Sequence, residues 1–323
     1  MSKVVGIDVG GTKVAAQLLA GERLGEHQQM PTALASGAAL LDQFTELVQR
    51  AADGVAVDAV GIGVPSVVRF ASGEVTSSVN IPLAGVALRQ VLGERLGVPV
   101  YVDNDANVAG LAEAHDEQLR LCVQNLVMLT IGTGIGGGVV SNGRIFRGAS
   151  GGGAELGHQL IALAVSDDVP MPGPSLPQAG SLEALASGRA LDHAAQLQAA
   201  AYPDSPLGRL AASGRSVKGA DAVAAAEQGC ELALAVVRRW SHAVGIGIAN
   251  AINVFDPDQI VIGGGGAAAG SLLLDYASEI ASGYVHPGLR GRAEIRFARF
   301  GPAAGVIGAA LLARQELEQA GNK

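Results

Sequence analysis

The sequence is poor in cysteine, in aromatic residues and in positive charge, and each shortage excludes a class of protein. Its two cysteines, Cys122 and Cys230, lie far apart in no CxxC pattern, which excludes a disulfide framework and fits a reducing compartment. Aromatic residues make up only 3%, and 22 Lys and Arg stand against 30 Asp and Glu, for a net charge of −8. A nucleic acid is therefore not expected as the main partner, because a phosphate backbone requires a basic surface.

The chain also lacks the segments that would direct it to a membrane. No apolar run reaches the length of about 18 residues that a membrane-spanning helix needs, so no membrane span is expected. Met1-Ser2-Lys3 leads directly into an apolar stretch, without the basic and apolar regions of a signal peptide. Together with the cysteine content, these absences predict a cytoplasmic protein.

Glycine and hydrophobic residues are abundant instead. There are 46 glycines, and hydrophobic residues make up 49% of 323 residues, a length that suggests about two domains. Residues 3–9 and 14–19 have the pattern of two strands joined by a glycine turn, and the pattern recurs at 126–131 and 137–140. Two matching hairpins predict a duplicated α/β unit.

The remaining elements alternate between strands and helices, which favours an α/β fold. Apolar spacing predicts helices at 36–52 and 86–96, and strands are expected at 58–64 and 100–102. Farther along we expect a proline-rich loop at 166–180, a helix at 181–200, a polar linker at 203–218, a long helical stretch at 219–253 interrupted near Gly245 and Gly247, a strand at 259–262 and a final helix at 303–319.

Three glycine-rich turns follow predicted strands, where backbone N–H groups can face an anion. The first, at 10–13, is preceded by Asp8, which can hold Mg²⁺ through water; a hairpin turn without function is the alternative. The second, at 132–138, holds five glycines in seven residues, more than a purely structural turn needs. The third, at 263–266, stands where adenine or ribose can bind, or is a plain strand–helix turn.

Two polar motifs offer candidate catalytic or binding groups. Asp103-Asn104-Asp105 follows an apolar run: it is either an Asx turn that caps a helix or the place of a carboxylate that takes a proton from a substrate. For Asp103 itself a strand-end role is favoured. Glu155 and His158 can converge on one polar ligand such as a sugar, or be a surface glutamate and a satisfied histidine.

These motifs, in this order, resemble the ROK family of sugar kinases and related regulators, with bacterial glucokinases the most similar members. The resemblance covers nearly the whole chain. It is carried by GIDVGGTKVAA (6–16), GIGVPS (61–66), SSVNIP (77–82), VDNDANVAG (102–110), LTIGTGIGGGVVSNGRIFRGASGGGAELGH (129–158), GSLEALASGRAL (180–191), FDPDQIVIGGG (255–265) and AAGVIGAALLA (303–313). The long segment at 129–158, together with Asn104-Asp105, is its most specific part.

The resemblance implies an actin-like, ribonuclease-H-like duplicated α/β fold of two lobes with a cleft between them. The small lobe would span 1–105 plus a C-terminal helix at about 306–323, and the large lobe 106–305. It further implies a phosphotransferase that uses ATP and Mg²⁺ to phosphorylate the 6-hydroxyl of a hexose, and that forms homodimers or homotetramers.

The resemblance also assigns roles to particular residues. Asp105 would be the catalytic base that accepts the proton of the sugar 6-hydroxyl. The sugar contacts would be Asn80, Asn104, Glu155, His158 and Glu183. The nucleotide-side positions would be Gly10, Gly11, Thr12, Lys13, Thr133, Gly134, Gly263, Gly264 and Gly265.

The sequence departs from the family at its metal site. Many members carry a CxCGxxGC zinc segment between the Gly-His pair and the LE motif, but residues 159–188 contain no cysteine. His158 alone cannot hold structural zinc, which normally takes four ligands, mostly thiolates, so no zinc is expected. The proline-rich loop at 170–177 would replace it, and the identity of the hexose is left more open than the reaction type.

Three functions follow from these observations. The first is an ATP-dependent hexokinase that prefers glucose, with mannose, fructose or an N-acetylhexosamine as other substrates and polyphosphate as another donor. The second is a sugar-responsive transcriptional regulator, against which stands the lack of a helix-turn-helix segment before Val4. The third is a non-catalytic sugar-binding protein, against which stand the intact Asp8, Asp105 and glycine turns.

Overall fold

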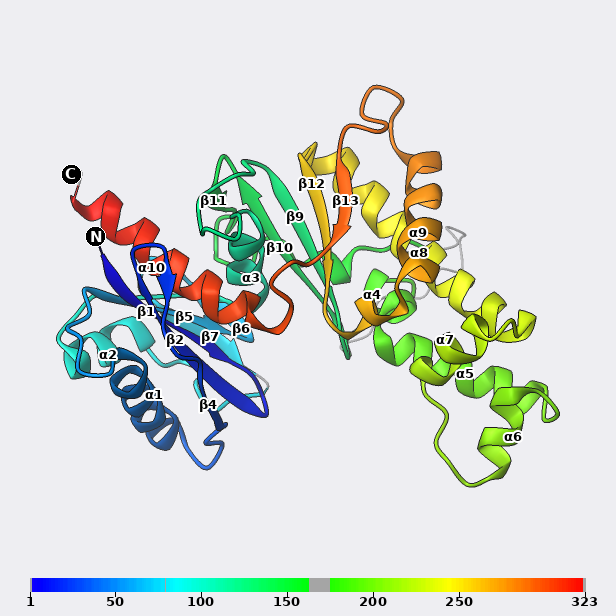
Figure 1. Cartoon of the computed structure of the whole chain (residues 1–323), viewed down its shortest axis with the longest axis horizontal. Coiled ribbons are helices and arrows are strands. Elements are labelled where there is room, and N and C mark those ends of the chain that lie inside the picture. The colour runs from blue at the N-terminus through cyan, green and yellow to red at the C-terminus, as the bar shows by residue number, and fades with distance from the viewer. Residues whose placement is uncertain (1, 79, 163–174, 322–323) are drawn as a thin grey trace. The chain divides into compact units, whose positions relative to one another are not determined.

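The computed structural model describes residues 2–78, 80–162 and 175–321 (Figure 1). Two compact units make up the chain: unit 1 is Met1–Met128, Gly138–Ala154 and Arg299–Lys323, and unit 2 is Leu129–Gly137 and Glu155–Ala298. The lobe boundary predicted between residues 105 and 106 falls inside unit 1. Most of the predicted proline-rich loop lies outside the described residues.

Unit 1 is built on a sheet with the order β3-β2-β1-β5-β8, in which β4 also pairs with β2. β1 and β2 form an antiparallel hairpin, and β5 and β8 extend the sheet in parallel from β1, so the first predicted hairpin is confirmed. The strands are β1 (Lys3–Val9), β2 (Lys13–Ala20), β3 (Arg23–Leu24), β4 (Gln28–Pro31), β5 (Ala59–Val64) and β8 (Val100–Asn104).

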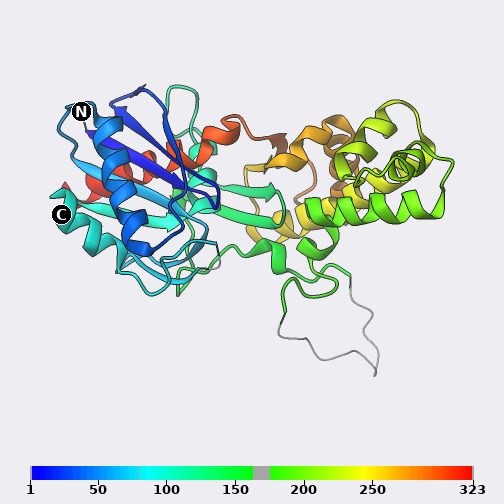
Figure 2. The same ribbon diagram turned by 90° about the horizontal axis from the view of Figure 1, so that it is seen from below.

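Four helices and a small hairpin accompany this sheet in unit 1. They are α1 (Gly37–Ala52), α2 (Leu88–Leu96), α3 (Asp105–Glu113), α10 (Ala304–Gly321) and the antiparallel pair β6 (Ser66–Arg69) and β7 (Glu74–Ser78). The helices predicted at 36–52, 86–96 and 303–319 are therefore confirmed. Figure 2 shows α1 lying along the sheet.

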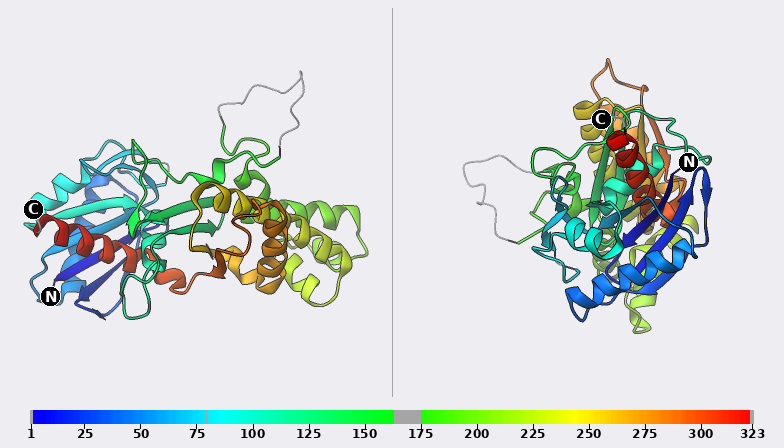
Figure 3. Two further views of the ribbon diagram at one scale, coloured as in Figure 1. Left: turned by 90° about the horizontal axis from the view of Figure 1, so that it is seen from above. Right: turned by 90° about the vertical axis from the view of Figure 1, so that its left-hand side faces the viewer.

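Alternate side chains of β1 face opposite sides of the sheet, as the pleat requires. Val5, Ile7 and Val9 join a buried cluster with side chains of α1 and α2. Gly6 faces α10, where an added Cβ would lie 2.1 Å from the Val306 carbonyl oxygen. Figure 3 shows α10, the C-terminal helix, lying across the strands of this sheet. Asp8 shares this second face with Gly6, so the sheet presents its carboxylate toward α10.

α3 packs directly on α10 because a glycine removes the side chain between them. A Cβ at Gly308 would lie 1.7 Å from the Val108 carbonyl oxygen of α3, a distance no side chain can occupy. The first residue of α3, Asp105, is thereby held on the same face of the sheet as Asp8. The fold itself brings these two carboxylates together.

The second sheet repeats the first in its strand order, β11-β10-β9-β12-β13. In each sheet an antiparallel pair, β2–β3 or β10–β11, lies at one edge and a parallel pair, β5–β8 or β12–β13, at the other. The strands are β9 (Leu126–Ile131), β10 (Ile135–Ser141), β11 (Arg144–Ile145), β12 (Gln259–Gly263) and β13 (Glu294–Phe297). The predicted duplicated α/β fold is confirmed.

Helices make up most of unit 2, and their ends correct three sequence-based expectations. They are α4 (Leu182–Ala186), α5 (Gly188–Ala201), α6 (Pro206–Ala212), α7 (Gly219–Glu227), α8 (Glu231–Phe255) and α9 (Ser271–Tyr284), with short 3₁₀ turns η1 (Leu156–His158), η2 (Gly265–Ala269) and, in unit 1, η3 (Gly301–Ala303). The single helix predicted at 181–200 is wrong: Ser187 ends α4 and caps α5 by accepting the N–H of Ala190. The polar linker predicted at 203–218 is wrong because it contains α6, which Ser205 caps and Pro206 begins.

The interruption predicted near Gly245 and Gly247 is also wrong. The break lies at Gly229, whose φ of +86° suits glycine, and α8 runs unbroken through both predicted positions. A Cβ at Gly245 would lie 2.7 Å from the Ala277 carbonyl oxygen of α9. This glycine therefore permits close helix packing instead of ending a helix.

By length and composition, α8 is the one described helix that could cross a membrane. Of its most apolar 18-residue stretch, 56% is buried inside the protein, as in the core helix of a soluble protein. Its Trp240 is among the buried residues, and its indole N–H donates to the carbonyl oxygens of Ala186 and Ser187 at 2.8 and 3.2 Å. These features indicate that α8 is a core helix of unit 2.

Candidate active site

Asp105 stands at the start of α3, where β8 ends. Asn104 caps the helix: its side-chain oxygen accepts the N–H groups of Ala106 at 2.9 Å and Asn107 at 3.2 Å. Asp105 accepts the Ala106 N–H at 2.8 Å, and its carboxyl group also interacts with its own N–H and with the Asn104 side chain. Two carboxylate oxygens offer about four acceptor sites, so capacity remains for another partner. The reading of the motif as an Asx cap is confirmed for Asn104, and the catalytic role of Asp105 stays a prediction.

The carboxyl groups of Asp105 and Asp8 both have raised pKa values. Burial raises the pKa of Asp105 to about 6; the nearby charge of Asp8 adds to this rise, and the Ala106 N–H opposes it. Burial likewise raises the pKa of Asp8 to about 6, against the opposing charge of Lys13. A pair of buried carboxylates that repel each other suits a cation or a proton-accepting task.

A slot lined by glycines holds the Asp8 carboxylate. A Cβ at Gly305 would lie 2.5–2.6 Å from the Asp8 carboxyl atoms, and a Cβ at Gly63 would lie 3.8 Å from Asp8 Oδ1 and 3.5 Å from Asp105 Cα. Any larger residue at 305 would displace the acid. This combination of cradle and donor chemistry fits a water-mediated Mg²⁺ ion at Asp8.

These raised pKa values predict a stability that falls as pH rises. The folded state keeps its protons up to about pH 6, whereas the unfolded carboxyls lose theirs near the ordinary value of 3.8, so stability is lost between these values. We expect Asp8→Asn to raise the free energy of unfolding by about 1–3 kcal/mol at pH 7.5 and by less at pH 5. Thermal unfolding at both pH values measures this, with the exposed Asp53→Asn as control. Equal shifts at both pH values, or destabilisation at pH 7.5, would contradict the expectation.

Asp103 fixes the backbone on which Asp105 stands. Its Oδ1 accepts the Asn104 N–H and the Asn107 side-chain N–H, both at 2.9 Å, and its Oδ2 accepts Arg147 Nε at 2.6 Å. Only 2% of Asp103 is exposed, and the Arg147 guanidinium carbon lies 3.5 Å from the centre of the Phe70 ring. Asp103 lies at the end of β8, as expected, and it also has a structural partner, Arg147, that no sequence pattern indicated.

The first glycine turn lies next to Asp8 in unit 1. Gly10 N–H donates to the Lys13 carbonyl oxygen at 2.9 Å and closes the hairpin. Asp8, Gly10 and Lys13 line one cavity of about 440 Å³. Asn80 lies beside this turn, since a Cβ at Gly11 would be 3.9 Å from the Asn80 Cβ. The structure thus brings Asp8, Gly10 and Lys13 to one cavity and Asn80 next to Gly11, and the site roles implied for them stay predictions.

Unit 2 contains a cavity of about 820 Å³ between the second and third glycine turns, within the range typical of ligand sites. Gly132 and Thr133 line one side, and Gly265 and Gly266 line another. Glycine at position 264 lets the third turn approach β9 closely. Its φ is +80°, and a Cβ there would lie 2.5 Å from the Ile131 carbonyl oxygen. Sequence reasoning missed further lining residues, which include Gly188, Arg189, Asp192 and Lys218.

Glu183 holds the second glycine turn in place. Its Oε2 accepts the Ile135 N–H at 2.8 Å, and its Oε1 lies 3.5 Å from Arg189. Arg189 in turn donates to the Thr133 carbonyl oxygen at 3.0 Å. A Cβ at Gly134 would come within 2.4 Å of the Glu183 carboxylate. The structure therefore shows Glu183 supporting the turn, and its predicted sugar contact stays a prediction.

Glu155 and His158 lie together, as their spacing predicts. His158 Nε2 is 3.7 Å from Glu155 Oε2, and 38% and 51% of the two side chains are exposed. η1 carries His158 and holds the pair one turn apart. Two exposed polar groups this close can hydrogen-bond a single polyhydroxylated ligand.

Comparison with known proteins identifies the fold class and the family of this chain. The duplicated sheets are those of the actin-like α/β class, and the chain belongs to the ROK family, whose model matches residues 4–316. It is 32% identical to a glucokinase of Halalkalibacterium halodurans over 97% of this chain and 95% of that protein. It is 34% identical to an N-acetyl-D-glucosamine kinase of Salmonella heidelberg, over 95% and 98%. A ROK family glucokinase from Streptomyces griseus, solved with glucose and AMPPNP, matches at a TM-score of 0.76 with 31% identity, over 97% and 100%.

Proposed function

We propose that the protein is an ATP-dependent sugar kinase of the cytoplasm that phosphorylates the 6-hydroxyl of a hexose, with glucose as preferred substrate. The observation that carries the proposal is the buried Asp105 carboxylate at the start of α3, whose pKa is raised to about 6. A general base is most effective when its pKa lies near the working pH. The names of the relatives support the same class of reaction.

In the proposed reaction Asp105 accepts the proton of the sugar 6-hydroxyl. The freed oxygen attacks the γ-phosphorus of ATP, a new P–O bond forms to the sugar, and the bond to the β-phosphate oxygen breaks to release ADP. Such transfers depend mainly on positioning and on neutralising charge. Asn104, Asn80, Glu155, His158 and Glu183 are the proposed sugar contacts.

The nucleotide is assigned to the glycine-lined cavity of unit 2. Its volume suits a nucleotide, and Arg189 and Lys218 supply positive charge for phosphate oxygens. In unit 1, Asp8 and the turn at Gly10, Gly11, Thr12 and Lys13 would contribute on the phosphate side. Mg²⁺ held by Asp8 would supply charge neutralisation. The absence of structural zinc and an assembly of two or four copies stay predictions.

A second substrate class is favoured by one comparison. The N-acetyl-D-glucosamine kinase of Salmonella heidelberg is at least as similar in sequence as the glucokinase relative, at 34% against 32% identity. An N-acetylhexosamine differs from glucose at the 2-position and keeps the 6-hydroxyl on which Asp105 would act. The reaction would then be unchanged, and only the contacts to the 2-substituent would differ.

A coupled assay with ATP, Mg²⁺ and a panel of sugars tests the proposal. We expect ADP release with glucose at a kcat/KM at least about tenfold above that for mannose, fructose or N-acetylglucosamine, because a site built for one set of hydroxyls leaves groups unpaired with another. Polyphosphate replaces ATP in a parallel series. ADP release with N-acetylglucosamine above glucose would select the second class, and no release with any sugar would overturn the kinase.

A further inference from the structure

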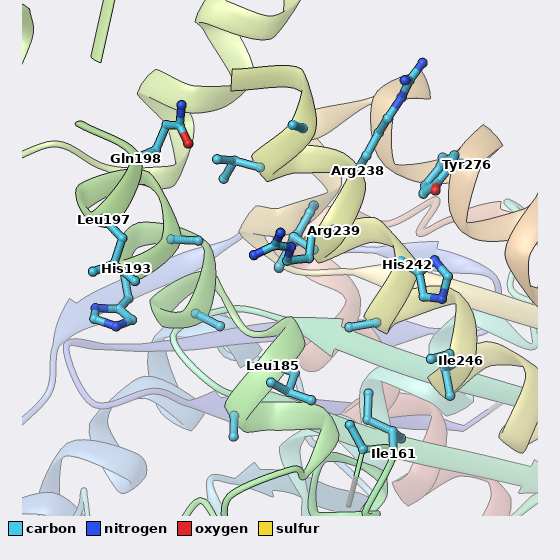
Figure 4. A pocket seen from close by; sticks show the side chains of 18 of the residues that line it. Ile161, Leu185, His193, Leu197, Gln198, Arg238, Arg239, His242, Ile246 and Tyr276 are labelled. Atoms are coloured by element: carbon cyan, nitrogen blue, oxygen red, sulfur yellow. The ribbon is translucent and has the colours of Figure 1, made fainter. Parts of the chain in front are cut away.

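A second cavity of about 680 Å³ lies in unit 2, between α5 and α8 (Figure 4). We propose that this groove binds an amphipathic anion, a compound with an aliphatic body and a carboxylate head, at a site separate from the nucleotide cavity. Its volume lies in the range of small-molecule sites. The proposal is independent of the proposed kinase reaction.

The groove exists because both helices present alanine to it. α5 contributes Ala190, Ala194 and Ala201, and α8 contributes Ala235 and Ala243, at helical spacings that keep each set on one face. Larger side chains at these positions would let the helices pack and close the space. The alanine face of α5 spans residues 190–201, eleven steps or about 16 Å at the helical rise, which accommodates an extended aliphatic chain.

Exposed leucines on the lining add an apolar surface that a ligand could cover. Leu197 of α5 is 59% exposed and Leu185 of α4 is 39% exposed. Burying such side chains against an aliphatic body removes apolar area from water, which is the main source of affinity for a chain of methylenes. The apolar lining therefore selects the body of the ligand.

Charge on the lining selects the head group. The groove is lined by His193, Arg238, Arg239 and His242, and by no Asp or Glu among the described residues, although the chain has a net charge of −8. Arg239 projects from α8 toward α5, whereas Arg238 points away from it (Figure 4). Neither arginine has an ion-pair partner within the described part of the chain. A carboxylate can therefore pair with Arg239 at the middle of the groove.

Two other side chains that line the groove, His242 and Gln198, also favour an anionic ligand. His242 packs against Tyr276 and Tyr284, with ring centroids 6.4 and 6.3 Å away, so its imidazole is held in place beside the groove. Gln198 contributes a side-chain nitrogen that is buried without a hydrogen-bond partner among the described residues. An N–H without an acceptor on the groove wall suits a carboxylate oxygen.

Trp240 provides a built-in reporter for this site. It is the single tryptophan of the chain, it is 3% exposed, and it lines both this groove and the nucleotide cavity. A ligand in either space changes its surroundings, and no other tryptophan contributes to the emission. Binding to the groove can thus be followed on the unlabelled protein and separated from nucleotide binding by competition.

The test titrates the full-length protein with decanoate, octanoate and hexanoate, following Trp240 fluorescence and the heat of binding. We expect one saturable site, an affinity that falls about fourfold for each methylene removed, and no binding of decyltrimethylammonium. Arg239→Gln should weaken decanoate binding by about tenfold, and Ala194→Leu should abolish it by filling the groove. The control Arg292→Gln removes an exposed arginine elsewhere in unit 2 and should bind like the parent.

Competition with AMPPNP and sedimentation test two other occupants of the groove, a nucleotide and a second copy of the chain. Saturating AMPPNP should leave the decanoate titration in place, since the two cavities are distinct. Displacement by AMPPNP, unchanged affinity in Arg239→Gln, or equal binding of decyltrimethylammonium would each overturn the proposal. Dissociation of an oligomer by Arg239→Gln or Ala194→Leu would overturn it as well, because the groove would then be covered by a second copy of the chain.

Discussion

Asp105→Asn is expected to lower kcat for glucose by about 10²–10⁴-fold while KM changes by no more than about threefold. Asparagine preserves the size of the side chain, and Asn104 continues to cap α3 through Ala106 and Asn107. What the variant loses is the group that accepts the proton in the transition state. A loss in kcat without a loss in KM identifies an interaction made in the transition state, and steady-state kinetics separate the two.

The pH profile adds a readout that a merely structural role would not move. In the parent, kcat should rise with pH around 6 as Asp105 ionises, and this acid limb should disappear from the residual activity of the variant. Asp8→Asn, if active enough to measure, should shift the limb to lower pH, because the Asp8 charge is one cause of the raised pKa of Asp105.

Folding of the Asp105→Asn protein is checked by its melting temperature, which should not fall at pH 7.5, since a buried charge has been removed. Asp53→Asn, an exposed change in the same unit, should keep the parent kcat. If the Asp105→Asn protein turned over glucose at the parent rate, Asp105 would have no part in the reaction, whatever its burial and pKa.

The parts of the fold that the sequence predicted correctly are those that local signals specify. The β1–β2 hairpin follows from a run of apolar residues, a glycine turn and a second run, and the same signals recur in β9 and β10. The start of α3 follows from Asn104, whose side chain can cap a helix wherever it occurs. Asp105 could be proposed from the sequence because the motif that carries it is local, and its catalytic role, implied by the family resemblance, stays a prediction.

The parts that the sequence could not predict depend on contacts between distant residues. Asp103 meets Arg147 across 44 positions, and Glu183 meets the Ile135 N–H across 48. No periodicity or spacing relates such pairs. Gly245 shows the same limit at a single position, because a glycine in a helical pattern is compatible with a break and with a close packing contact, and only α9 decides between them.

The pairing of Asp103 with Arg147 leads to the largest expected effect on stability. Arg147→Met would leave the Asp103 carboxylate, 3% exposed in its side chain, without its cationic partner. Removing one member of a buried ion pair typically costs about 3–5 kcal/mol, because the other charge stays buried and uncompensated. The free energy of unfolding in urea measures this loss. The kcat of the folded protein should fall as well, since Asp103 holds the Asn104 backbone and the Asn107 side chain on either side of Asp105.

Arg95→Met is the matched control, because Arg95 pairs with Asp42 at 2.7 Å at the surface, with 37% and 74% of the two side chains exposed. That change should cost no more than about 1 kcal/mol. The double variant Asp103→Asn, Arg147→Met should recover much of the loss, since asparagine keeps an oxygen for Asn104 and Asn107 and carries no charge. Equal losses in Arg147→Met and Arg95→Met would show that the buried pair contributes no more than the surface pair. A double variant less stable than Arg147→Met would show that the Asp103 charge stabilises the fold even when Arg147 is absent. Recovery of stability without recovery of kcat would instead assign to the ion pair a part in positioning Asp105 that the neutral hydrogen bonds cannot replace.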